Sequence, residues 1–127
     1  MKMRYPVAVA FLAGVALGVV AIQALRAETR SPAYVVAETD VMDEALYQKT
    51  YAPLAAKAIV DAGGKYIVRA GTSFSLFGVP PKLIAIIRFD SLEKAEAAFN
   101  SPAYKEAKKA GDEYANFRVY AIEGVAQ

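Results

Sequence analysis

Residues 32–43 read Pro-Ala-Tyr-Val-Val-Ala-Glu-Thr-Asp-Val-Met-Asp and carry the pattern that most restricts the fold. Side chains on a β-strand point alternately to opposite sides. Val35 and Thr39 would therefore share an apolar face, while Tyr34 and Glu38 would share a mixed one. This stretch is the first expected strand, and a strand of this kind needs cover on both of its faces.

The composition excludes several kinds of chemistry. The chain has 127 residues, which indicates a single domain, and it contains no cysteine and no histidine. Disulfides, thiolate metal sites and a cysteine nucleophile are therefore impossible. The commonest general base and metal ligand is missing as well. The residues imply no metal and no cofactor.

The first 27 residues resemble a targeting segment. Lys2 and Arg4 give a basic start, residues 7–22 form an uninterrupted apolar run, and Ala27 offers a small residue for cleavage. Two interpretations stay open: a cleaved signal peptide, or a retained membrane anchor. Either one would place the body outside the cytoplasmic membrane, as a periplasmic or secreted protein.

The charge of the body differs from that of the whole chain. The formal net charge is +2, but three of the 15 basic residues lie in the leader, whereas all 13 acidic residues follow it. From Glu28 onward the net charge is therefore −1. A nearly neutral body argues against nucleic acid as a partner, and a membrane would be contacted only through residues 1–27. The expected domains are a leader at 1–27, a linker at 28–32 and a folded domain at 33–127.

The remaining sequence predicts three more strands and two helical regions. Asp43 or a neighbour would cap the first helix, Pro53 would kink or divide it near Lys49, and Gly63 and Gly64 would end it. In the second helical region Asp90-Ser91 would cap the helix, with Glu93 placed for a capping box from Asp90, and Ser101-Pro102 would start a further short helix. The later strands are expected at 65–71, 82–90 and 116–125.

The element order is strand, helix, strand, strand, helix, strand. With right-handed crossovers this order gives a four-stranded antiparallel sheet in spatial order 4-1-3-2, with both helical regions on one face. The expected fold is the α+β class with a ferredoxin-like βαββαβ arrangement. No helix remains to cover the other sheet face, so a second copy of the chain is the economical cover.

Several short motifs resemble one known family, domain of unknown function 1330. They are Ala33-Tyr-Val-Val-Ala-Glu-Thr-Asp40, Tyr47 with Tyr51, Ala62-Gly-Gly64, Phe89-Asp-Ser-Leu92, Asn100-Ser-Pro-Ala-Tyr104 and Ile122-Glu-Gly-Val125. The resemblance covers about residues 32–126. It implies a dimeric α/β barrel in which two ferredoxin-like sheets pack face to face, and it implies no particular reaction. Family members often carry an acidic residue where Phe77 precedes Gly78 here.

The expected strand pairing gathers five candidate ligand-binding residues. Glu38 would lie near Arg118, Arg69 would lie at the same end of the sheet, and Arg88 would lie at the other end near Tyr34. One interpretation is a pocket in the barrel for a small, partly apolar molecule, with an arginine as anchor for an anionic group and Glu38 as a base. The other is an interfacial Glu38–Arg118 pair that fixes dimer register in a non-catalytic structural or interaction protein of the cell envelope. The sequence does not decide whether the protein is an enzyme.

Two sets of aromatic residues leave further alternatives open. Tyr47 and Tyr51 lie on the apolar stripe of the first helix, where core packing is favoured over contact with a ligand. Phe74 and Phe77 lie in the connection between the second and third strands. This connection is either a lid, a subunit contact, or a segment packed on the edge of the domain.

Overall fold

The computed structural model describes residues 31–126. The expected leader at 1–27 and most of the expected linker lie outside the described residues. Within the described part, no helix has both the length and the apolar character needed to cross a membrane.

The order of elements confirms the predicted arrangement. The strands are β1 (Ala33–Val41), β2 (Lys65–Arg69), β3 (Leu83–Phe89) and β4 (Ala115–Glu123); the helical elements are α2 (Glu44–Leu46), the π-helical turn η1 (Tyr47–Tyr51), α3 (Ala52–Asp61), α4 (Leu92–Phe99) and α5 (Pro102–Gly111). The first helical region therefore consists of three consecutive segments, and the second of two.

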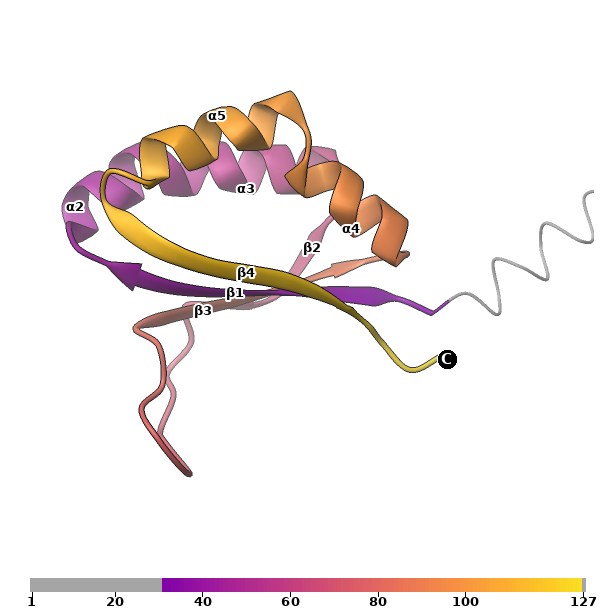
Figure 1. Ribbon diagram of the computed structural model, residues 1–127, viewed down its shortest axis with the longest axis horizontal. Coiled ribbons are helices and arrows are strands. Elements are labelled where there is room, and N and C mark those ends of the chain that lie inside the picture. Colours follow the sequence, from indigo (N-terminus) through magenta and orange to yellow (C-terminus); the bar gives the residue numbers. More distant parts are fainter. Residues whose placement is uncertain (1–30, 127) are drawn as a thin grey trace, which may run out of the picture. The chain divides into compact units, whose positions relative to one another are not determined.

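The four strands form one antiparallel sheet in the order β2-β3-β1-β4. This is the predicted order 4-1-3-2 read from the opposite edge. In the centre of the sheet, Val35 of β1 lies opposite Ile87 of β3 and Ala121 of β4. The fold is α+β with the ferredoxin-like topology. The helices of residues 31–126 all lie on one side of the sheet, and none of them covers the other side (Figure 1).

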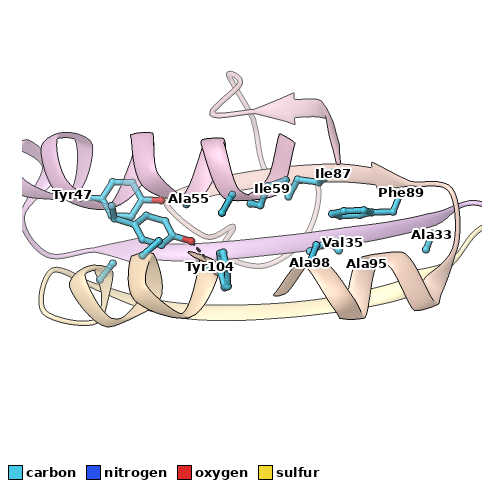
Figure 2. Packing of buried hydrophobic residues seen from close by; sticks show 14 of the residues in the cluster. Ala33, Val35, Tyr47, Ala55, Ile59, Ile87, Phe89, Ala95, Ala98 and Tyr104 are labelled. Atoms are coloured by element: carbon cyan, nitrogen blue, oxygen red, sulfur yellow. Dashed lines mark hydrogen bonds between the residues drawn. The ribbon is translucent and has the colours of Figure 1, made fainter. Parts of the chain in front are cut away.

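The hydrophobic core lies between the sheet and the helices. Figure 2 shows Val35, Ile87 and Phe89 of the sheet in one cluster with helical residues such as Ala55 and Ile59. The three sheet residues are the largest fully buried side chains. The alternation predicted for the first strand is confirmed: Val35, Thr39 and Val41 are buried against the helices.

The helix starts follow the predicted signals with one correction. The Asp43 carboxylate accepts a hydrogen bond from the Leu46 amide, so Asp43 caps α2. Ser101 caps α5, with Pro102 as the first helical residue. At α4 the cap is Ser91 of the expected Asp90-Ser91 pair, because its hydroxyl accepts a hydrogen bond from the Lys94 amide. The capping box expected from Asp90 is the part that is wrong, since Asp90 is not the cap.

Candidate functional site

A cavity of about 120 Å³ lies between the helices and the strands β1, β2 and β3, and it is partly open to solvent. Its walls combine aliphatic side chains with several hydroxyl groups. The polar and aromatic-hydroxyl residues that line it are Thr39, Tyr47, Gln48, Tyr51, Tyr66, Arg69 and Tyr104. These residues come from four different elements, β1, η1, β2 and α5, so only the folded chain brings them together.

The π-helical turn places two of the tyrosines. Pro53 has no amide hydrogen and cannot donate to the Lys49 carbonyl as an α-helix requires. The turn before it is wider, with the Ala52 amide donating to the Tyr47 carbonyl. Tyr47 and Tyr51 are both buried on this turn, with ring centroids 5.1 Å apart. The predicted division of the helix at Pro53 is therefore present, and single π turns of this kind are frequent at functional sites.

The buried hydroxyl groups bond to one another. The hydroxyl oxygens of Tyr51 and Tyr104 lie 3.0 Å apart, and Figure 2 marks this hydrogen bond with a dashed line beside Tyr104. The neighbouring Thr39 side chain acts to lower the pKa of Tyr47, against the increase caused by burial. No buried side-chain nitrogen or oxygen in residues 31–126 is left without a hydrogen-bond partner. The cavity wall therefore carries a few polar groups, and those that are buried all have hydrogen-bond partners.

Burial keeps these tyrosines neutral. Desolvation raises the pKa of Tyr51 far above its ordinary value, and the neighbouring Tyr104 adds to the increase. Burial also raises the pKa of Tyr104, although its hydrogen bond with Tyr51 opposes the change. The pKa values of Tyr47 and Tyr66 are raised by burial too, with the positive charge of Arg69 acting against it. At neutral pH these groups donate and accept hydrogen bonds but do not act as bases.

Arg69 is the only charged residue among those that line the cavity. Its guanidinium carbon lies 4.8 Å from the centroid of the Tyr66 ring, a cation–π contact. The side chain is exposed, so it lies at the mouth of the cavity. Ala70 beside it has a φ of 51°, a left-handed conformation that residues other than glycine rarely adopt and that is frequent near functional sites.

The position of Arg69 corrects the sequence interpretation. Strict alternation places Arg69 and Tyr66 on opposite faces, because they are three residues apart. The strand has a β-bulge instead: Tyr66 pairs with Ile87, Val68 pairs with Ile86, and the ladder shifts by one residue between them. Arg69 therefore shares the helix-covered face with Tyr66.

The other four candidates lie on the uncovered face, in two pairs. Tyr34 lies opposite Arg88, and Glu38 lies opposite Arg118, as the expected strand pairing required. The Arg118 Nε and Glu38 Oε2 atoms are 3.6 Å apart; the arginine side chain is 81% exposed and the glutamate 25%. The fold thus separates Arg69 from the other four candidates.

The family of the chain follows from its sequence. A profile of the family described as Domain of unknown function (DUF1330) matches residues 32–125. The chain belongs to this family. The match confirms the resemblance noted from short motifs, and it spans the whole described domain. No curated protein shows significant similarity to the chain.

Solved structures share the fold of this DUF1330 domain. A protein of unknown function from Rhodopseudomonas palustris has a TM-score of 0.63 and 14% identity, covering 77% of this chain and 85% of its own. SnoaB from Streptomyces nogalater, a cofactor-independent oxygenase, has a TM-score of 0.56 and 11% identity, covering 76% and 96%. A candidate antibiotic biosynthesis monooxygenase from Caulobacter crescentus has a TM-score of 0.55 and 17% identity, covering 77% and 93%. At these identities the likeness establishes the fold alone.

The DUF1330 domain offers little for metal binding. Within residues 31–126 no three histidine, cysteine, aspartate or glutamate side chains are grouped so that they could hold a metal ion. The cavity itself is lined by no carboxylate. Its polar groups suit an organic ligand better than a cation.

Proposed function

We propose that this DUF1330 domain binds a small, partly apolar molecule in the tyrosine-lined cavity. The observation that carries the proposal is the combination of aliphatic walls, buried neutral hydroxyl groups and a single arginine at the mouth. Ligand sites are typically apolar with a few well-placed polar groups. An apolar cavity of about 150 Å³ holds benzene. At about 120 Å³ this cavity is somewhat smaller, so it suits a short chain, or one ring that extends partly into the open mouth.

Arg69 gives the ligand an orientation. A carboxylate or another anionic group would lie at the mouth, where the guanidinium can donate two parallel hydrogen bonds to it. The apolar part of the ligand would then point inward, toward Ala55, Ile59 and Leu83. The hydroxyl pair of Tyr51 and Tyr104 would face the inner end of the ligand.

Binding is better supported than acid–base catalysis. A general base must be able to lose its proton near the operating pH. The residues lining the cavity include no carboxylate, and the four tyrosines have raised pKa values. Glu38, the base considered from sequence, lies on the other face of the sheet.

A second proposal concerns assembly and location. We infer that two copies pair through the uncovered sheet face, because large apolar side chains on it are exposed, among them Val68, Tyr120 and Ile122. The basic start and the apolar run at 7–22 support export of the domain to the periplasm or beyond. A structural or interaction role in the cell envelope is the competing function, and it would need the dimer but not the cavity.

A binding experiment with a small probe tests the proposal. Benzoate carries an anionic group on a flat apolar body, and benzamide is its uncharged counterpart. Calorimetry should show tighter binding of benzoate than of benzamide to the wild type, and Arg69→Met should remove this preference. Arg88→Met is the matched control, because Arg88 lies on the uncovered face.

Native mass spectrometry complements the calorimetry, since it reports a retained ligand and the oligomeric state together. A small molecule retained by the wild type and lost from Arg69→Met would support the proposal. Equal affinity of all three proteins for benzoate, with nothing retained, would contradict it and favour the structural role.

A further inference from the structure

The connection between β2 and β3, residues 70–82, is here called the β2–β3 loop. It carries four large apolar side chains that are almost entirely exposed: Phe74 84%, Leu76 78%, Phe77 98% and Val79 97%. Residues 70–81 include no charged side chain. Such a concentration of exposed apolar surface marks an interaction site. Packing on the edge of the same chain, one of the alternatives considered from sequence, is excluded by these values.

The β2–β3 loop has a defined shape. The Ser75 hydroxyl donates a hydrogen bond to the Gly78 carbonyl, which closes a tight turn at the tip. Gly78 has a φ of 75°, a conformation that glycine adopts without strain. Pro80 and Pro81 then restrict the backbone on the way back to the sheet. The apolar side chains are therefore held outward in advance of any contact.

The loop leaves the sheet on the side away from the helices (Figure 1). At its base, Val79, Pro80 and Pro81 border a shallow groove together with Glu38 and Arg118, which are residues of the uncovered sheet face. The apolar loop and the uncovered face thus form one continuous surface. A single partner can cover both.

We propose that the β2–β3 loop clasps a second copy of this chain, with Phe77 and Val79 packed against the edge of the partner's sheet. The inference rests on the proposed pairing of uncovered faces. Sheets packed face to face lie about 10 Å apart. A loop of about six residues out and six back can extend to about 20 Å. In such a pair each loop therefore passes the plane of the partner's sheet and lies beside its edge.

The charges on the uncovered face favour a second copy over a lipid bilayer. This face carries Glu38 and Asp40 as well as Arg88 and Arg118. An apolar bilayer interior would remove these charges from water, at a large cost in free energy even where they are paired within the chain. A second copy brings both signs of charge, so that a basic group of one subunit can lie opposite an acidic group of the other.

Sedimentation velocity on protein purified from cells expressing the full chain tests the clasp. Phe77→Asp combined with Val79→Asp should raise the dimer dissociation constant about a hundredfold or more, since buried aromatic anchors dominate interface energies. The far-ultraviolet circular dichroism should not change. Leu54→Asp combined with Val60→Asp is the matched control, because these apolar residues are also exposed but lie on α3. It should leave the dimer intact.

The absence of cysteine in the chain allows a second measurement that does not depend on weakening the dimer. A photoreactive benzophenone on Phe77→Cys should link two chains, whereas the same group on Val60→Cys should not. A wild-type dimer that is unaffected by the loop substitutions and gives no cross-link at Phe77 would overturn the clasp alone. A monomeric wild type would overturn the dimer as well, and binding of that monomer to phosphatidylcholine vesicles would identify a bilayer as the occupant. Neither result would bear on benzoate binding.

Discussion

The hydroxyl groups of Tyr51 and Tyr104 lie 3.0 Å apart, although 53 residues separate the two tyrosines in the chain. One comes from the π-helical turn and the other from α5. Both side chains are buried. Each hydroxyl therefore depends on the other for the hydrogen bond that offsets its removal from water.

Removing one hydroxyl of this pair should destabilise the fold. Tyr104→Phe leaves the Tyr51 hydroxyl buried without its partner, which should lower the free energy of unfolding by about 1–3 kcal/mol. Removing both hydroxyl groups should cost less than the sum of the two single substitutions, because no unpaired group remains. Urea denaturation of the four proteins measures the coupling. Strictly additive losses would mean that the two hydroxyls do not depend on each other.

Gly111 should tolerate no side chain. A Cβ atom at this position would lie 2.5 Å from the Tyr51 ring and 2.9 Å from Phe117. Gly111→Ala should therefore lower the free energy of unfolding by about 1–3 kcal/mol, even though alanine favours a helix. It should also push the Tyr51 ring into the cavity and weaken benzoate binding. Gly71→Ala is the control, since a Cβ there meets nothing within 4 Å and should change neither quantity.

Stability should fall at alkaline pH. The pKa values of Tyr51 and Tyr104 are raised in the folded protein, whereas in the unfolded chain they return to about 10. Above about pH 10 the unfolded state releases protons that the folded state retains. Unfolding is then favoured by up to about 1.4 kcal/mol per pH unit for each such tyrosine. Ultraviolet titration should show a group of tyrosines that ionise only together with unfolding; ionisation of all tyrosines near pH 10 in the folded state would contradict this.

The Glu38–Arg118 pair should respond to assembly. Within one chain Arg118 is largely exposed, and an exposed ion pair contributes about 0–1 kcal/mol. If a second copy covers the pair, Arg118→Ala leaves Glu38 buried alone, at a cost of about 3–5 kcal/mol. We expect the large cost in the wild-type background and the small one in the dissociated loop variant. Urea denaturation measures the cost of Arg118→Ala in the wild type and in the loop variant. An equally small cost in both would mean that the Glu38–Arg118 pair stays exposed.

The strand order and much of the register could be predicted from the sequence, because they depend on local patterns. The alternation around Val35, the cap at Asp43 and the Ser101-Pro102 helix start are each specified within a few residues. The pairing of Glu38 with Arg118 then follows from the topology.

The cavity could not be predicted in the same way. Tyr104 reaches Tyr51 only through the packing of α5 on the first helical region, and no local spacing indicates that contact. The sequence indicates the stripe that contains Tyr47 and Tyr51, but both of its interpretations, core packing and ligand contact, require a buried tyrosine. Strict alternation predicts the wrong face for Arg69 relative to Tyr66, because a bulge in a five-residue edge strand leaves no clear mark in the sequence.

The bulge in β2 also affects how related chains should be aligned. Because Ile67 and Val68 together lie opposite Ile86 alone, a relative lacking the residue equivalent to Ile67 would restore a regular ladder and still direct the equivalents of Tyr66 and Arg69 toward the cavity. A one-residue gap at this position would thus preserve the mouth of the cavity. An ungapped alignment of the same two chains would shift the arginine by one place and make it look lost during evolution.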